Sequence, residues 1–232
     1  MTRSTVSTPT KPATSDSIAQ ALSLAIHEHK IAPGTKLGED DLAEIYGVSR
    51  TVVRAALQSL HHIKLVDIRR NKGASVAFPS IKEAHEVFEA RELLEPRTAR
   101  SAALYATRED IALLERHITD EHKALDDADP GRALYLSGLF HTEIARIAQQ
   151  ATIAGFIETL IARSSLIIAL YWRRESALCE KHAHHALVQA LADKDGQQAE
   201  ELMRSHLVDL HSALDLTERK GRTQSLKDAL SQ

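Results

Sequence analysis

Three histidines in the second half of the chain have the residue type and the setting for metal chemistry. His141, His184 and His206 each lie on or beside an apolar stripe of a segment with helical periodicity. Imidazoles that point inward from three helices can converge, and imidazole is a preferred ligand of zinc, nickel and related ions. Taken singly, each histidine fits a hydrogen-bonded core residue better than a metal ligand, so the residues alone leave both interpretations open.

A second group of residues has the chemistry of nucleic-acid recognition. Residues 50–72 contain six basic side chains and one acidic one, whereas residues 81–232 contain nineteen basic and twenty-five acidic ones. A basic focus in an otherwise acidic chain predicts contact with a polyanion, and a solvated basic surface is the alternative. Arg50 and Arg54, one helical turn apart, can hydrogen-bond guanine edges or phosphates from one face. Thr51 can contact a phosphate or a thymine methyl group.

Two helices are predicted ahead of these basic residues. The segment "IAQALSLAIHEHK" has a helical apolar stripe and follows Ser15 and Ser17, either of which can cap its first turn. The "PG" of "IAPGTK" is a strong turn signal that ends it. The segment "EDDLAEIY" then predicts a short second helix, with Leu42 and Ile45 facing inward.

A third helix and a hairpin are predicted to carry the candidate DNA contacts. Ser49 is placed to cap "RTVVRAALQSLHHI", and "LVDIRRNKGASVAF" indicates two short strands joined at "RNKG". Three helices and a hairpin, with a tight turn before the third helix, form a winged helix-turn-helix, whose third helix fits the DNA major groove. The predicted DNA-binding residues are Lys36, Ser49, Arg50, Thr51, Arg54, Arg69, Asn71, Lys72 and Gly73.

The remainder of the chain predicts helices only. Helical segments are expected at 81–105, 109–127, 131–149, 152–174, 176–193 and 196–219, joined by short loops. The expected fold is therefore mainly α, with an N-terminal winged helix-turn-helix at 15–78 and a C-terminal antiparallel six-helix bundle at 81–220. Polar tails are expected at 1–14 and 221–232.

Both parts resemble a known family. The stretch "APGTKLGEDDLAEIYGVSRTVVRAALQSL", followed by "LVDIRRNKGASVA", resembles the amino-terminal domain of the GntR family of bacterial transcription regulators. The segments "ARELLEPRTARSAA", "GLFHTEIARIA" and "HHALVQALADKDGQQAEELMRSHL" resemble the FCD ligand-binding domain of the FadR branch. Six helices resemble its VanR-like subgroup. This resemblance implies a homodimer that reads palindromic double-stranded operator DNA, and an effector pocket that often holds a divalent metal.

The resemblance also assigns residues and shows departures. It implies that His141, His184 and His206 are metal ligands, for zinc or nickel. The family aspartate four residues before the first of these is Ser137 here, and a neutral hydroxyl is a poor ligand. We therefore expect a weaker metal site that an anionic effector completes. The alternative is a site without metal, in which the histidines hold an effector directly. In the DNA-binding part, Lys64 stands where glycine commonly precedes the wing, and valine 52 replaces a proline.

Two arginines are further candidates for the effector pocket, together with Ser137. Arg91 lies in the "RELLE" segment and can clamp a carboxylate with two hydrogen bonds, or it can pair with Glu95 one helical turn later. Arg163 can bind an anion from its apolar helix or can pair with an acid such as Glu158. The residues do not decide between these alternatives.

Composition narrows the class of protein. A single cysteine excludes an internal disulfide framework and fits a reducing cytoplasm. No apolar run approaches the roughly 20 residues that span a bilayer, so no membrane partner is expected. The expected function is a cytoplasmic, dimeric transcription regulator, in the family-typical case a repressor, that responds to a small organic acid and is not an enzyme. The alternatives are a regulator with a metal-free acyl or lipid pocket, and a metalloenzyme built on the three histidines.

Overall fold

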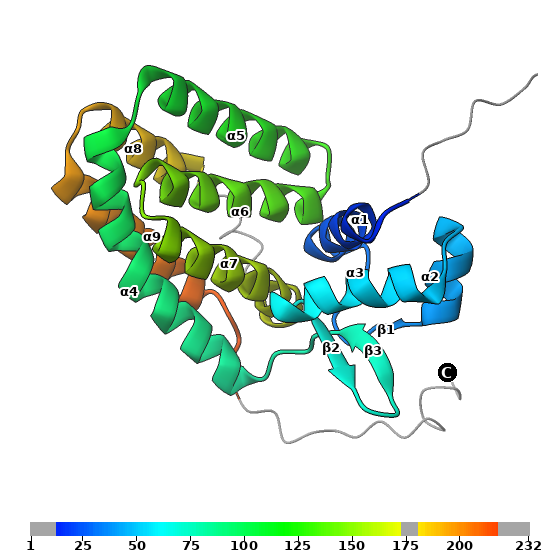
Figure 1. Ribbon diagram of the computed structural model, residues 1–232. Helices are drawn as coiled ribbons and strands as arrows, with labels where there is room; N and C mark the ends of the chain where they lie inside the picture. Colours follow the sequence, from blue (N-terminus) through cyan, green and yellow to red (C-terminus); the bar gives the residue numbers. More distant parts are fainter. Residues whose placement is uncertain (1–12, 173–180, 218–232) are drawn as a thin grey trace, which may run out of the picture.

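The computed structural model describes residues 13–172 and 181–217. Most of both predicted tails, and the ends of the helices predicted at 152–174, 176–193 and 196–219, lie outside the described residues. Within them, the chain forms a small winged unit and a larger helical unit, as Figure 1 shows. The predicted fold class is confirmed.

The winged unit consists of three helices and a three-stranded sheet. The helices are α1 (Ser15–His27), α2 (Glu39–Tyr46) and α3 (Arg50–His62), and the strands are β1 (Lys36–Leu37), β2 (Val66–Arg69) and β3 (Gly73–Val76). The sheet is antiparallel with the order β1-β3-β2. The strands β2 and β3 form the predicted hairpin. Strand β1 was not predicted, because two residues carry no periodic signal before they pair with β3.

The core of the winged unit follows the predicted apolar stripes, with one error. The buried side chains include Ile18, Leu22, Ile26, Leu42, Val53, Ala56, Leu57 and Leu60. Ile45 was predicted to face inward but is 72% exposed. Helix α2 has only eight residues, and Leu42 is its one buried side chain. A helix this short buries one narrow line of contacts, and Ile45 falls outside that line.

Capping residues explain where several helices begin. Thr14, rather than the predicted Ser15 or Ser17, caps α1 and forms a reciprocal capping box with Ser17. Ser80 and Thr107 form the same box at the starts of α4 and α5. Ser49 is the N-cap residue of α3, as predicted, although its side chain makes no capping hydrogen bond.

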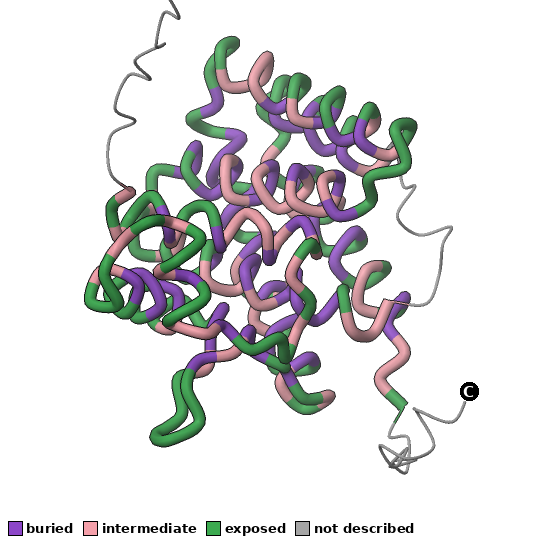
Figure 2. Tube along the Cα trace, turned by 90° about the vertical axis from the view of Figure 1, so that its right-hand side faces the viewer, coloured by how far each residue is buried: buried purple, intermediate pink, exposed green. Residues whose placement is uncertain are grey.

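The helical unit contains six helices in the described part of the chain, as predicted. They are α4 (Ile81–Tyr105), α5 (Arg108–Asp126), α6 (Pro130–Ile147), α7 (Ala151–Tyr171), α8 (Lys181–Ala192) and α9 (Gly196–Ser212). In Figure 1, α5, α6 and α7 form successive rows, α4 runs across one end of these rows beside α9, and α1 and α3 lie at the other end. Figure 2 shows that buried residues line the inside of this stack and exposed residues its outer surface.

Helix α7 packs against both units. It is the one helix in the described residues that is long and apolar enough to cross a membrane. However, Ala162 and Leu166 belong to the apolar core of the winged unit, and Ile167 and Ile168 pack inside the helical unit. This packing is that of a core helix shared by both units, which accounts for its composition without a membrane.

Candidate functional site

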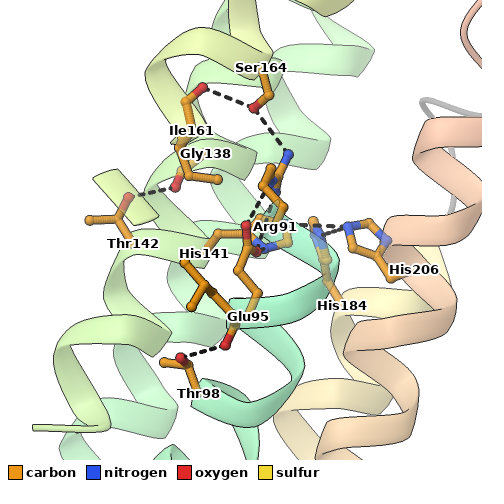
Figure 3. Close-up of polar contacts among 11 residues, drawn as sticks. Arg91, Glu95, Thr98, Gly138, His141, Thr142, Ile161, Ser164, His184 and His206 are labelled. Carbon is orange, nitrogen blue, oxygen red and sulfur yellow. Dashed lines mark hydrogen bonds and ion pairs between the residues drawn. The ribbon is translucent and has the colours of Figure 1, made fainter. Parts of the chain in front are cut away.

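The three histidines predicted to converge do meet inside the helical unit. His141, His184 and His206 come from α6, α8 and α9, and all three are buried. The Nε2 atom of His206 lies 3.2 Å from Nε2 of His141 and 3.3 Å from Nε2 of His184. Figure 3 shows the three rings pointing toward one another. We call this group the three-histidine cluster.

Two carboxylates hold two of these rings in place. The Nδ1 atom of His141 lies 2.7 Å from Oε2 of Glu95 on α4, and Nδ1 of His184 lies 3.1 Å from Oε2 of Glu121 on α5. An imidazole that donates its Nδ1 hydrogen to a carboxylate keeps the lone pair on Nε2. The Nδ1 atom of His206 is buried and has no hydrogen-bond partner in the described residues. Sequence reasoning found neither carboxylate as a support for a histidine, since both contacts are long-range.

Burial and neighbouring charges keep His141 and His206 neutral and Glu95 ionised. Burial lowers the pKa of His141, although the nearby Glu95 opposes this shift. Burial, followed by the positive charge that the neighbouring histidines and Arg91 would present, holds the pKa of His206 well below its usual range. Burial alone would raise the pKa of Glu95, but Arg91 and His141 outweigh it and lower that pKa to about 2. At neutral pH, His141 and His206 therefore offer uncharged imidazoles beside a carboxylate anion.

The geometry of the three-histidine cluster fits a divalent metal ion. Tetrahedral zinc, with bonds of about 2.0–2.1 Å, sets its ligand nitrogens about 3.3–3.4 Å apart. The two Nε2 separations of 3.2 and 3.3 Å agree with that value. Neutral nitrogens held by carboxylates are also the donor set that such ions bind. Ser137, four residues before His141 on α6, lines the same cavity and supplies no charge.

The cluster opens into a cavity of about 240 Å³ in which polar groups and apolar surface are mixed. Arg91 lines it and is held by Glu95, with Nε at 2.5 Å from Oε1, and by Ser164, whose Oγ is 3.1 Å from Nη1. The sequence had left a pair with Glu95 as one alternative for Arg91, and the structure contains that pair. Trp172 also lines the cavity, and its indole Nε1 is buried with no partner in the described residues.

The structure does not bring Arg163 into this cavity. Its Nη2 atom lies 3.4 Å from Oε1 of Glu83, so its partner is a residue of α4 and not the expected Glu158. Glu158 itself lines the cavity. The winged unit contributes His27, a cavity-lining residue that the sequence did not indicate, because nothing in α1 shows which elements its last turn will meet.

The predicted DNA-binding residues form a second, very different site, which we call the reading face. All nine are exposed: Lys36, Ser49, Arg50, Thr51, Arg54, Arg69, Asn71, Lys72 and Gly73. The structure places Arg50 and Arg54 side by side on α3, where both contact Glu39 of α2. The Nε atom of Arg54 lies 2.8 Å from Oε2 of Glu39. No local pattern in the chain indicates that one carboxylate bridges the two arginines.

The wing completes the reading face. Lys36, Arg69, Lys72 and Gly73 line one surface hollow of about 280 Å³ between the strands. The wing turn places Asn71 at φ 62° and Gly73 at φ 77°, the left-handed region that suits asparagine and glycine. Lys64, between α3 and β2, also has a left-handed φ of 64°. That conformation explains on physical grounds why glycine is favoured at this position.

Comparison with known families gives two matches that together cover most of the chain. Residues 14–76 match the family described as bacterial regulatory proteins, gntR family. Residues 86–209 match the FCD domain. The first match contains the reading face, and the second contains the three-histidine cluster.

Individual relatives and solved structures agree with these matches. The Uxu operon transcriptional regulator of Escherichia coli is 31% identical over 78% of this chain and 79% of its own length. The HTH-type transcriptional repressor RspR of Escherichia coli is 27% identical over 92% of this chain and 94% of its own length. The structure of E. coli McbR/YncC superimposes with a TM-score of 0.76 at 20% identity, over 85% of this chain and 95% of that one, which shows a shared fold.

Proposed function

Because the chain belongs to the GntR family of bacterial regulatory proteins and carries the FCD domain, it is a DNA-binding transcription regulator of that type, and we propose that it is a ligand-responsive repressor. In this proposal a homodimer binds a palindromic operator in the cytoplasm, and a small organic acid in the cavity changes its affinity for DNA. The observation that carries the ligand part is the convergence of three buried imidazole nitrogens inside a cavity next to the winged unit.

The reading face supports the DNA part of the proposal. Helix α3 enters the major groove, where its exposed first turns reach base edges. Arg50 and Arg54 contact guanine edges or phosphates, and Thr51 contacts a phosphate or a thymine methyl group. The remaining residues of the reading face, on the wing and in the turn before α3, contact the DNA backbone. Contact with DNA replaces the ion pairs of Arg50 and Arg54 with Glu39. This exchange costs little free energy, because surface ion pairs contribute little stability.

The three-histidine cluster supports a metal-assisted effector site. His141, His184 and His206 would hold a zinc or nickel ion, and Glu95 and Glu121 would keep the first two rings oriented. The ion would supply positive charge to an anionic ligand. Ser137 adds no negative charge where an aspartate would, so the site favours a ligand that brings its own carboxylate. Arg91 lies in the same cavity, and its guanidinium has more N–H donors than the three that bond to Glu95 and Ser164.

The cavity argues against the two alternative functions. A hydrocarbon chain would offer no hydrogen-bond partner to the polar side chains that line the cavity, such as Ser137 and His27, and burying polar groups unpaired is unfavourable. An acyl or lipid pocket is therefore a poorer fit. A metalloenzyme would need a free general base, but the carboxylate of Glu121 already accepts a hydrogen bond from His184. The two Escherichia coli relatives are also transcription regulators.

Exposed apolar side chains support the homodimer. Leu93 on α4 is 77% exposed and Phe156 on α7 is 60% exposed. Only 44% of the most apolar window of α7 is buried within one copy. A second copy that covers these side chains would bury that surface, and two reading faces together would match a palindrome. The repressor direction is supported by the relative RspR, which is named a repressor.

Native mass spectrometry of the protein as purified from metal-supplemented cells tests the proposal. We expect a dimer with one metal ion per chain, and a retained acid lost together with the metal in the His141→Ala variant. The Arg163→Ala variant, altered outside the cavity, should keep both. A monomer, or equal metal content in the His141→Ala and unmodified proteins, would contradict the proposal.

A further inference from the structure

The end of α1 is locked against the start of α6. A side chain at Gly131 would place its Cβ 2.0 Å from the backbone oxygen of Glu28, so only glycine allows this approach. The carboxylate of Glu28 is 6% exposed and lies 2.9 Å from Nη1 of Arg132. The close backbone contact, together with an ion pair whose carboxylate is buried, means that the last turn of α1 and the first turn of α6 move together.

The same turn of α1 is also tied to α7. The Nε2 atom of His29 lies 3.2 Å from the backbone oxygen of Ser165, and Ser165 Oγ lies 3.5 Å from the backbone oxygen of His27. Ala162 and Leu166, on the same helix, pack into the apolar core of the winged unit. Residues 27–29 are therefore held between two helices of the other unit.

Within this junction, the ring of His27 faces the cavity. It is a lining residue together with Ser165 and Tyr135, and its ring centroid lies 6.0 Å from that of Tyr135. Burial, and then the nearby His29, lower the pKa of His27 to about 4, so its imidazole is neutral at neutral pH. The ring makes no hydrogen bond within the described residues, which leaves one N–H donor and one acceptor available to a ligand.

We propose that His27 makes the DNA-reading unit part of the wall of the cavity, so that a molecule filling the cavity against His27 changes operator affinity by direct contact. The proposal rests on the proposed function, because it assumes that the cavity takes a ligand and that the winged unit binds DNA. It adds that the effect of the ligand on DNA affinity passes directly to α1 and does not need to travel through the other helices of the helical unit.

The path from His27 to the DNA is short. Helix α1 carries His27 at its last residue, and its Ile18, Leu22 and Ile26 lie in the same apolar core as Val53 and Leu57 of α3. Close-packed cores transmit displacements because they have little free volume. A ligand that pushes the last turn of α1 therefore shifts or tilts α3, and with it the arginines of the reading face.

A tethered group that stands in for the ligand tests this inference in the full chain. The only cysteine is first replaced by Cys179→Ser, and His27→Cys is added. Benzyl methanethiosulfonate then transfers its benzylthio group to the introduced thiolate, forming a disulfide and releasing methanesulfinate. The matched control carries Ala21→Cys, at an exposed position on the same helix. Affinity is measured for a DNA sequence that the unmodified protein selects from a random pool.

We expect the benzylthio group at position 27 to lower operator affinity at least tenfold, and dithiothreitol to restore it. The same group at position 21 should change affinity less than twofold. Tyr135→Cys, at the cavity-lining residue whose ring lies 6.0 Å from that of His27, gives a second attachment point with the same expected loss, should His27→Cys fail to fold.

Two outcomes would overturn the inference while leaving the proposed function in place. One is unchanged DNA affinity after complete modification at positions 27 and 135. The other is an introduced thiol that reacts only after unfolding, since it would show that the cavity does not open onto His27. If the unmodified protein selects no DNA sequence at all, the proposed function itself fails.

Discussion

The reading face and the cavity at the three-histidine cluster, called the pocket below, each contain an arginine–glutamate pair, but in opposite surroundings. On the reading face, Arg54 pairs with Glu39, and the two side chains are 59% and 28% exposed. In the pocket, Arg91 pairs with Glu95, and the two are 3% and 2% exposed. The exposed pair contributes little stability and separates easily, which suits the proposed exchange of its carboxylate partner for DNA. The buried pair is fixed, because separating it leaves a charge without a partner in an apolar interior.

The largest effect should come from breaking the buried pair. Glu95→Ala leaves the Arg91 charge buried and frees the ring of His141, so we expect a loss of about 3–5 kcal/mol in the free energy of unfolding. Urea denaturation followed by circular dichroism measures this. The matched change on the reading face, Glu39→Ala, should cost less than about 1 kcal/mol. Equal losses in the two variants would remove the distinction between the sites.

The next effect concerns DNA binding. Arg54→Ala should weaken specific operator binding by about 1–3 kcal/mol, the range for one bidentate base contact, while the protein stays folded. Operator and unrelated DNA are compared by fluorescence anisotropy at fixed salt concentration. His184→Ala, in the pocket, serves as the control and should keep its sequence selectivity in the absence of ligand. Unchanged selectivity in Arg54→Ala would show that α3 is not the recognition helix.

The proposed metal site at the three-histidine cluster can be tested by adding the negative charge that Ser137 lacks. Ser137→Asp adds a carboxylate one helical turn before His141, and we expect zinc to bind about tenfold more tightly, as an added charged ligand implies. Competition with chelators of graded affinity measures the change. The control is Ser137→Asn, because asparagine has nearly the same size as aspartate but no charge. This variant should leave zinc affinity close to that of the unmodified protein. If the aspartate variant binds zinc no better, the three-histidine metal site is wrong.

The two sites also differ in what the sequence could reveal. Exposed residues such as Arg50 and Thr51 follow from the local order of helix, turn and helix, because their function needs no partner from elsewhere in the chain. The pocket depends on contacts between distant segments. The apolar stripes placed His141 and His206 inside the bundle, but Glu121 and His27 reach the pocket only through packing that no periodicity encodes. The prediction that Ile45 faces inward was wrong for a related reason, since the neighbouring elements determine which side of a two-turn helix is exposed.

The stability of the protein should also respond to acid through His27, which lines the cavity. Since the pKa of His27 is about 4 in the folded protein and 6.5 in its unperturbed state, unfolding takes up a proton between these values. The contribution of neutral His27 is present in full above about pH 6.5 and is lost as the pH falls toward 4. His27→Phe, which cannot titrate, should therefore show a shallower decline of the free energy of unfolding between pH 6.5 and 4. A decline as steep as that of the unmodified protein would show that His27 is not buried.

The smallest effect should come from the link between α3 and the wing. Lys64 is held at φ 64°, a conformation that places strain on any residue with a Cβ, and glycine adopts it freely. The glycine gains flexibility in the unfolded chain as well, which offsets part of the relief. Lys64→Gly should therefore raise the free energy of unfolding by no more than about 1 kcal/mol. The matched change Lys82→Gly, in the first turn of α4, should lower it by about the same amount, because glycine weakens a helix. Thermal unfolding of the two variants distinguishes these signs, and a loss of stability in both would show that the left-handed turn before the wing is not a source of strain.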